Sequence, residues 1–185
     1  MKTYIITISK HFLTTHKRAG EETNFKEKFL NGEKIHTIRV NHPLWEKRIK
    51  EAQEGCAVLS VRQWTGKPYR SKQVEIARLT AENGIGVQQL DIFDFMRPAK
   101  VDSCQLVDLR DLANNDGLSF SDWYHWFRLT DVIKPMAIIH FGLMVKCTPE
   151  RGQKCSLFHL MVKCTPIIVE LPSVYRGCKS LICFQ

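Results

Sequence analysis

The sequence predicts an α+β fold, a small β-barrel with helices at its rim, followed by an irregular C-terminal extension. Short runs rich in β-branched residues recur along residues 1–141, and small helical segments lie between them, which indicates the α+β class. A content of 44% hydrophobic and 25% charged residues is ordinary for a globular protein that buries a core. Residues 142–185 are basic and Cys-rich, and they lack a clear helical or strand period beyond IIVEL. We therefore expect one domain over residues 1–141 and a poorly ordered extension over residues 142–185.

The first two elements are predicted by composition and by helix-boundary signals. Tyr4–Ser9 is rich in β-branched residues and predicts a strand. Asn24 is placed to cap a short helix, Glu27 three residues later resembles a capping box, and Gly32 is a natural C-terminal stop. The buried stripe of this helix is expected to comprise Phe25, Phe29 and Leu30.

The next elements follow the same logic. A strand is expected within Gly32–Val40, and Pro43 can open a second helix that Gly55 ends. Cys56–Trp64 alternates well enough for a strand, and Lys72–Leu79 predicts another strand after a Gly-Lys-Pro turn.

Three helices and one strand are expected in the rest of the domain. Val87–Met96 is apolar at helical spacing, and Leu106–Asn115 predicts another helix. Ser119 with Asp122 begins a third helix, whose aromatic stripe is far more often core than binding platform: Phe120, Trp123, Trp126 and Phe127. Met136–Phe141 predicts a final buried strand.

The extension has two unusual features. LMVKCTP occurs at Leu143–Pro149 and again at Leu160–Pro166, and two copies are too few for a stacked repeat architecture. Five of the seven cysteines fall in the last 39 residues, without any CxxC pair that would indicate a zinc site. Our hypothesis is an appended segment that limited proteolysis removes near residue 141.

The formal net charge of +8 is unevenly distributed. Counted as Lys and Arg against Asp and Glu, residues 1–80 carry 16 against 8, residues 81–141 carry 5 against 9, and residues 142–185 carry 6 against 2. The basic segments can attract a polyanion such as RNA, or a nucleotide. A solvated face that keeps the protein soluble explains the same charge, so both alternatives stay open.

Several function classes lack support. No apolar run approaches the roughly 18–20 residues needed to span a bilayer, and the N-terminus lacks the features of a signal peptide, so we expect a cytoplasmic protein. No P-loop, GxGxxG or HExxH motif occurs. We therefore expect no cofactor, metal or membrane partner.

The stretch GEKIHTIRV carries Lys34, His36, Thr37 and Arg39 among only three apolar residues. A strand that only packs a core needs none of these four, so it is either a solvated edge or a face turned toward something bound. Side chains alternate along a regular strand, so Lys34 and Thr37 can share a site only if Gly32–Ile35 forms a turn or bulge. His36 could touch a substrate, although a lone His is more often an ordinary surface or core residue.

GEKIHTIR, followed by HPLWEKRIKEAQEG and LSVRQWTGKPYRSKQ, resembles the ASCH domain family over about residues 1–141. Members of that family typically show G-x-K-x-x-T-x-R, and Gly32, Lys34, Thr37 and Arg39 match the pattern. The resemblance implies a PUA-like β-barrel, related to RNA-binding PUA domains.

The resemblance also implies a catalytic set. Small members of the family are N(4)-acetylcytidine amidohydrolases that use a Lys, a Thr and a Glu; here these are Lys34, Thr37 and Glu82, with Glu75 in reserve. Lys34 with a lowered pKa would be the base, and Thr37 would be the nucleophile or position a water. Glu82 would hold the lysine or pass a proton to the leaving amine. Arg39 would bind a phosphate or polarise the carbonyl.

A second candidate surface is the aromatic and basic loop WTGKPYRSK. Trp64 and Tyr69 can stack a base while Lys67 and Arg70 meet phosphates; equally, the loop can be a turn that packs Trp64 inward.

Three hypotheses follow. The leading one is an amidohydrolase that deacylates an N(4)-acetylcytidine-like nucleoside. The alternative is a non-catalytic RNA-binding module that uses Arg39, Lys67 and Arg70, and a third is an accessory protein of a mobile element, suggested by the repeated tail. The expected partner is a modified nucleoside or RNA.

Overall fold

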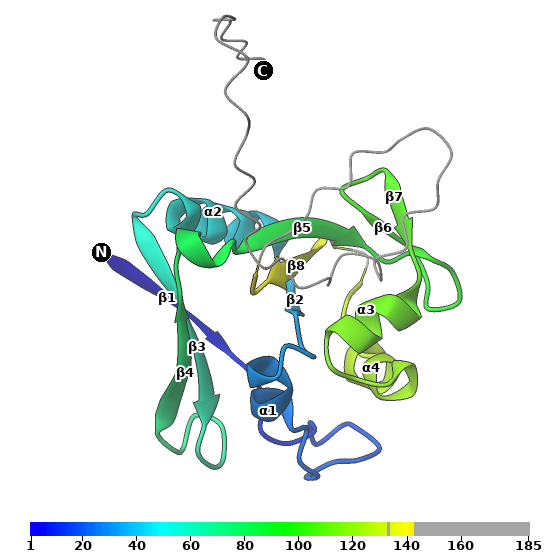
Figure 1. Ribbon diagram of the computed structural model, residues 1–185. Helices are drawn as coiled ribbons and strands as arrows, with labels where there is room; N and C mark the ends of the chain where they lie inside the picture. The colour runs from blue at the N-terminus through cyan, green and yellow to red at the C-terminus, as the bar shows by residue number, and fades with distance from the viewer. Residues whose placement is uncertain (133, 143–185) are drawn as a thin grey trace, which may run out of the picture. The chain divides into compact units, whose positions relative to one another are not determined.

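The computed structural model describes residues 1–132 and 134–142. Apart from Gly142, the expected extension and its LMVKCTP repeat lie outside the described residues. The strands form two sheets and short helices lie beside them, so the α+β class is confirmed (Figure 1).

The smaller sheet has three strands in the order β1-β3-β4. They are β1 (Lys2–Thr7), β3 (Ala57–Trp64) and β4 (Gln73–Leu79). β1 pairs with β3 in parallel, and β3 pairs with β4 as an antiparallel hairpin with a register shift between Val61 and Arg62. All three strands match the segments that the sequence predicts.

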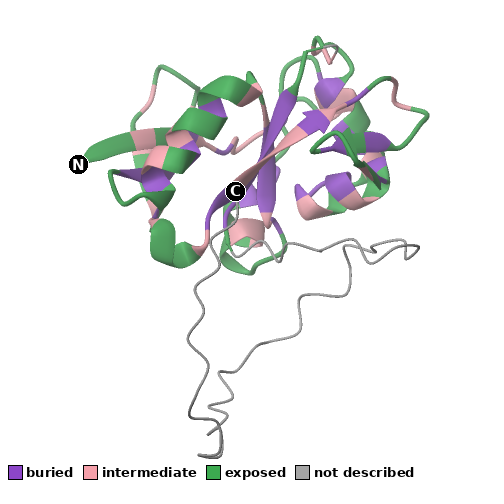
Figure 2. Ribbon diagram, turned by 90° about the horizontal axis from the view of Figure 1, so that it is seen from above, coloured by how far each residue is buried: buried purple, intermediate pink, exposed green. Residues whose placement is uncertain are grey.

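The larger sheet has five strands in the order β2-β8-β5-β6-β7, and all its described pairings are antiparallel. They are β2 (His36–Val40), β8 (Met136–His140), β5 (Gly86–Asp91), β6 (Ala99–Val101) and β7 (Gln105–Val107). β8 is buried along its whole length because it lies between two neighbouring strands and carries an apolar run (Figure 2). The expected final buried strand is thereby confirmed.

The helices are α1 (Phe25–Leu30), α2 (His42–Gln53), α3 (Leu109–Asn115) and α4 (Phe120–Phe127), with a 3-10 turn η1 (Ala81–Asn83). α2 contacts β3 of the smaller sheet and β5 and β8 of the larger one. Its buried face comprises Trp45, Ile49 and Ala52. One helix therefore shares its apolar face with both sheets.

The described residues do not form the closed barrel that the sequence predicted. Every described strand pairing lies within one of the two sheets, and none joins β1 or β4 to an edge of the other sheet. The two sheets are connected in other ways. Helix α2 packs against both, and the Arg39 side chain of β2 donates to the backbone oxygen of Thr7 in β1.

One element was assigned wrongly from the sequence. Val87–Met96 was expected to be helical, but Gly86–Asp91 is the strand β5, and the chain then continues as a loop. β5 is hydrogen-bonded between β8 and β6, and this pairing overrides the helical spacing of its apolar residues. Met96, which a helical stripe would have buried, is 94% exposed.

One helix boundary and one helix cap also differ. Leu106 belongs to β7, and α3 begins only at Leu109, after the Asp108 side chain accepts a hydrogen bond from the amide of Arg110. At α1, Asn24 makes no side-chain cap, and Leu30 is 60% exposed, so the expected capping box and part of the expected stripe are absent there.

Candidate functional site

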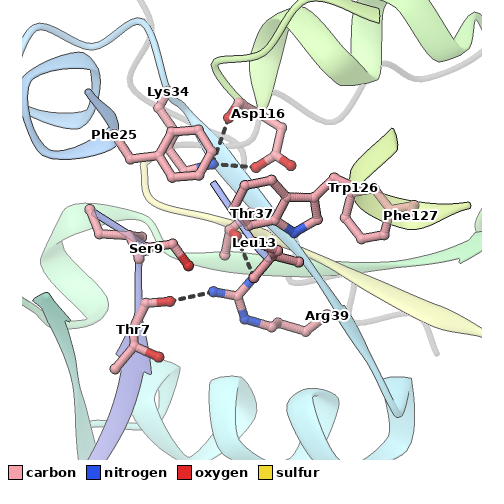
Figure 3. Close-up of a pocket in the computed structure, with 11 residues that line it drawn as sticks. Thr7, Ser9, Leu13, Phe25, Lys34, Thr37, Arg39, Asp116, Trp126 and Phe127 are labelled. Carbon is pink, nitrogen blue, oxygen red and sulfur yellow. Dashed lines mark hydrogen bonds and ion pairs between the residues drawn. The ribbon is translucent and has the colours of Figure 1, made fainter. Parts of the chain in front are cut away.

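A cavity of about 240 Å³ lies where β1 ends, beside β2, α1 and the turn after α3 (Figure 3). Polar side chains and backbone from β1, β2 and the turn face aromatic and aliphatic side chains from α1, α4 and the loop after β1. The lining residues are Thr7, Ile8, Ser9, Leu13, Phe25, Lys34, Thr37, Arg39, Asp116, Trp126 and Phe127.

Lys34 reaches this cavity because the chain turns before β2 begins. Gly32 has a left-handed φ of 75°, and the strand starts only at His36. The amide of Lys34 donates to the Lys28 oxygen at 3.0 Å, and the amide of Ile35 donates to the Asn115 oxygen at 3.0 Å. Lys34 is therefore outside the strand alternation, and the turn required for Lys34 and Thr37 to share a site is present.

Lys34 forms a buried ion pair with Asp116. Its Nζ donates to the Asp116 backbone oxygen at 2.6 Å and also to Asp116 Oδ1, and it lies 4.2 Å from the centroid of the Phe25 ring. Lys34 is 2% exposed, and Asp116 is also buried. Because a buried charge without a partner is strongly destabilising, each group depends on the other.

Burial shifts the two groups of this pair in opposite directions. Desolvation lowers the pKa of Lys34, the attraction of Asp116 opposes that fall, and the cations Arg39 and Lys28 add to it. Desolvation raises the pKa of Asp116 against the effect of Lys34. Both shifts favour the neutral forms, so proton transfer from the ammonium to the carboxylate costs less here than in water.

Thr37 and Arg39 lie on one face of β2, two residues apart. Arg39 Nη1 donates to Thr37 Oγ1 at 2.8 Å and to the Ile38 oxygen at 2.8 Å, while Nη2 donates to the Thr7 oxygen at 2.5 Å. Since Thr37 Oγ1 is the acceptor, the hydrogen of its own hydroxyl can be donated elsewhere. In the view of Figure 3, Thr37 lies between Lys34 and Arg39.

An aromatic wall completes the cavity. Trp126 of α4 lies 5.6 Å from Phe25 and 5.8 Å from Phe12 between ring centroids, with both pairs inclined rather than parallel. The expected core role of the α4 stripe holds for Trp123 and Phe127, which are buried. Trp126 is half-buried and packs against the core, and it also lines the cavity, as Phe127 does.

The two glutamates named from the sequence are not part of this site. Glu82 is exposed on η1 and does not line the cavity. Glu75 lies on β4, where hydrogen bonds from Ser60 and Arg78 lower its pKa. The carboxylate that the structure places beside Lys34 is that of Asp116.

His36 is buried on the face of β2 opposite to Thr37. Its Nε2 lies 3.1 Å from the Leu112 oxygen, its Nδ1 has no partner among the described residues, and its ring lies 5.7 Å from that of His140. Burial lowers the pKa of His36 and of His140 to about 3. Both rings are therefore neutral at pH 7, and His36 does not line the cavity.

The aromatic and basic loop is the tip of the β3–β4 hairpin, outside the cavity lining. Tyr69 is 90% exposed with a left-handed φ of 63°, and its ring lies 5.4 Å from that of the half-buried Trp64. Lys67 and Arg70 are exposed. The site residues proposed from the sequence thus separate into a cavity group and a hairpin-tip group.

Sequence reasoning missed Asp116, which lies 82 residues from Lys34. Asp116 directly follows the helix expected over Leu106–Asn115, and Gly117, with a left-handed φ of 77°, turns the chain after it. A buried lysine requires a counter-charge, but no local pattern tells which distant carboxylate supplies it.

No group of three or more His, Cys, Asp or Glu side chains able to hold a metal occurs within residues 1–132 and 134–142. Over the same ranges, no helix combines the length and apolar character that a membrane crossing requires. The fold and site define an α+β domain with a buried Lys–Asp pair at a small aromatic-walled cavity. Comparison with protein-family models, curated proteins and solved structures finds no match.

Proposed function

We propose that this chain is an ASCH-type domain, with a partly open PUA-like barrel, that hydrolyses the amide of an N(4)-acetylcytidine-like nucleoside. The observation that carries the proposal is the buried Lys34–Asp116 pair, which shares one small cavity with the hydrogen-bonded Thr37 and Arg39. Three of the four G-x-K-x-x-T-x-R residues line that cavity, and the fourth, Gly32, forms the turn that lets Lys34 reach it.

The cavity suits a small planar substrate. Its volume of about 240 Å³ lies just below the usual range of ligand pockets, roughly 300–1,000 Å³, so it can take only a small ligand. Trp126 offers an aromatic surface, and aromatic rings stack favourably with nucleobases. The cavity is lined by two cationic side chains, Lys34 and Arg39, and one anionic side chain, Asp116, so its net charge is positive by one. This charge stabilises the carbonyl oxygen, which becomes negative during attack.

The first half of the reaction transfers the acyl group to Thr37. A proton passes from Lys34 to Asp116, and the neutral amine takes the hydroxyl proton as Thr37 Oγ1 bonds to the acyl carbon. Arg39 has five N–H donors, of which the described bonds use three, so two remain to stabilise the oxyanion. The Lys34 ammonium then protonates the leaving nitrogen, the C–N bond breaks, and the amine departs.

The second half consumes water. Lys34 accepts a proton from a water molecule whose oxygen bonds to the acyl carbon of the Thr37 ester. The bond between that carbon and Thr37 Oγ1 breaks, the proton returns to Oγ1, and Asp116 returns its own proton to Lys34. The overall reaction converts one amide and one water into a carboxylic acid and an amine.

Incubation of the full chain with N(4)-acetylcytidine, followed by mass spectrometry, tests this proposal. We expect loss of the acetyl group, and a rate lower by at least about 100-fold in Lys34→Met, Thr37→Val and Asp116→Asn. Lys26→Met, at an exposed position of α1, is the matched control and should keep full activity. A folded protein without hydrolysis, or full activity in Lys34→Met, contradicts the proposal.

Non-catalytic RNA binding is the second candidate function, favoured by the hairpin tip. Tyr69 is exposed, and Lys67 and Arg70 make no ion pair with any residue of the described ranges. Binding through the tip predicts affinity for single-stranded RNA that falls steeply with salt. It also predicts weaker binding by Tyr69→Ala and Arg70→Ala, and unchanged binding by Thr37→Val.

A further inference from the structure

We propose that Lys28 is a positioning residue that holds Lys34 and Asp116 together at the wall of the cavity. Lys28 lies on α1, outside the G-x-K-x-x-T-x-R pattern, and does not itself line the cavity. The effect of Lys28 on turnover rests on the proposed function, whereas the contacts that Lys28 makes do not depend on it.

Lys28 contacts both chain segments that carry the pair. Its backbone oxygen accepts the amide of Lys34 at 3.0 Å and that of Glu33 at 2.8 Å, just before β2. Its Nζ donates to the Gly117 oxygen at 2.7 Å, in the turn after α3. One residue therefore joins the segment just before β2 to a turn that lies 89 positions after Lys28 itself.

Because Gly117 has no side chain, the turn that contains it can approach Lys28 and Lys34 closely. A Cβ added to Gly117 would lie 3.3 Å from Lys34 Cβ and 3.3 Å from Lys28 Cδ, tighter than ordinary van der Waals contact. The turn therefore packs against the stems of both lysines. Because Asp116 immediately precedes Gly117, the Lys28 hydrogen bond sets how closely the carboxylate approaches Lys34.

Electrostatics provide a test that distinguishes positioning from charge alone. The charged groups that act on Lys34 are Asp116, Arg39 and Lys28. The charge of Lys28 lowers the pKa of Lys34, so removing only that charge would raise it. Loss of the Gly117 contact instead moves Asp116 away from Lys34. The attraction of the Asp116 carboxylate raises the pKa of Lys34, so the pKa falls when that attraction is lost.

The experiment is a pH titration of Lys34 by NMR, using the 13Cε resonance of lysine-labelled full chain assigned with Lys34→Arg. We expect the Lys34 pKa in Lys28→Met to lie below that of the unsubstituted protein, and Lys26→Met to leave it unchanged. An unchanged or raised pKa in Lys28→Met overturns the proposal. If Lys28→Met does not fold, Lys28→Gln replaces it, since this polar side chain is one atom shorter, and the same fall is expected.

Kinetics provide the second readout. With N(4)-acetylcytidine as the probe, we expect kcat of Lys28→Met to fall by about 100-fold with little change in KM, because the pair is displaced rather than removed. Wild-type turnover with an unchanged kcat in Lys28→Met overturns the positioning role. No turnover by the unsubstituted protein refutes the proposed function, while the NMR titration still decides the role of Lys28.

Discussion

The segment around β2 and the tip of the β3–β4 hairpin carry similar residue types in opposite environments. Lys34 and Thr37 are buried; Lys34 bonds to the distant Asp116, and Thr37 accepts a hydrogen bond from Arg39 of the same strand. Lys67 and Tyr69 are exposed at the hairpin tip. A charge that water solvates contributes little to stability, whereas a buried charge depends on its protein partner. The same residue types are therefore buried and paired in one region and surrounded by solvent in the other.

The strongest test of this comparison is to break the buried pair. We expect Asp116→Ala to lower the free energy of unfolding by about 3–5 kcal/mol, because the Lys34 charge loses its buried partner. Urea denaturation measures this change. The double variant Lys34→Met/Asp116→Leu removes both charges and should recover much of the loss; equal stability of the single and double variants would contradict the role of the pair.

A second test uses the buried histidines behind β2. The pKa of His36 and of His140 is lowered from 6.5 to about 3, so as pH falls through this window the unfolded chain binds protons that the folded chain does not. Stability should fall with decreasing pH, by up to about 1.4 kcal/mol per pH unit for each histidine.

Denaturation midpoints between pH 7 and pH 4 measure this dependence. His140→Asn should reduce the slope relative to the unsubstituted protein, since one of the two groups no longer titrates. An identical slope in both proteins would show that other groups control the acid sensitivity.

A third test concerns the turn that carries Asp116. Gly117→Ala forces a side chain into a left-handed backbone with φ of 77° and into contact with Lys34. We expect a loss of about 1–3 kcal/mol in thermal or urea unfolding. Gly20→Ala, with φ of 85° and no atom within 4 Å of the added Cβ, is the control that separates backbone strain from crowding. Equal losses in both variants would mean that the close approach to Lys34 has no effect.

The smallest change is expected at the hairpin tip. Lys67→Ala and Arg70→Ala should alter the free energy of unfolding by less than about 0.5 kcal/mol, because both side chains are exposed. Chemical denaturation checks this expectation. A loss comparable to that of Asp116→Ala would remove the contrast between the two regions.

Much of the fold was predictable; the closed barrel and the segment around β5 were not. The β-branched run of β1 and the Ser119 cap of α4 are local signals, and both elements form where these signals indicate. The segment around β5 failed because its apolar spacing suits a helix, while its pairing with β8 and β6 is decided by residues far along the chain. Short apolar runs leave this ambiguity open.

For the site, the sequence by itself determined that Lys34, Thr37 and Arg39 belong to one segment of six residues. Only the tertiary structure decided which carboxylate meets the lysine and which ring of α4 lines the cavity. Asp116 and Trp126 come from the turn after α3 and from α4, and packing brings them to the end of β1 and to β2. The burial of Lys34 also depends on the tertiary structure, because distant segments must cover the side chain. That burial lowers the pKa of Lys34.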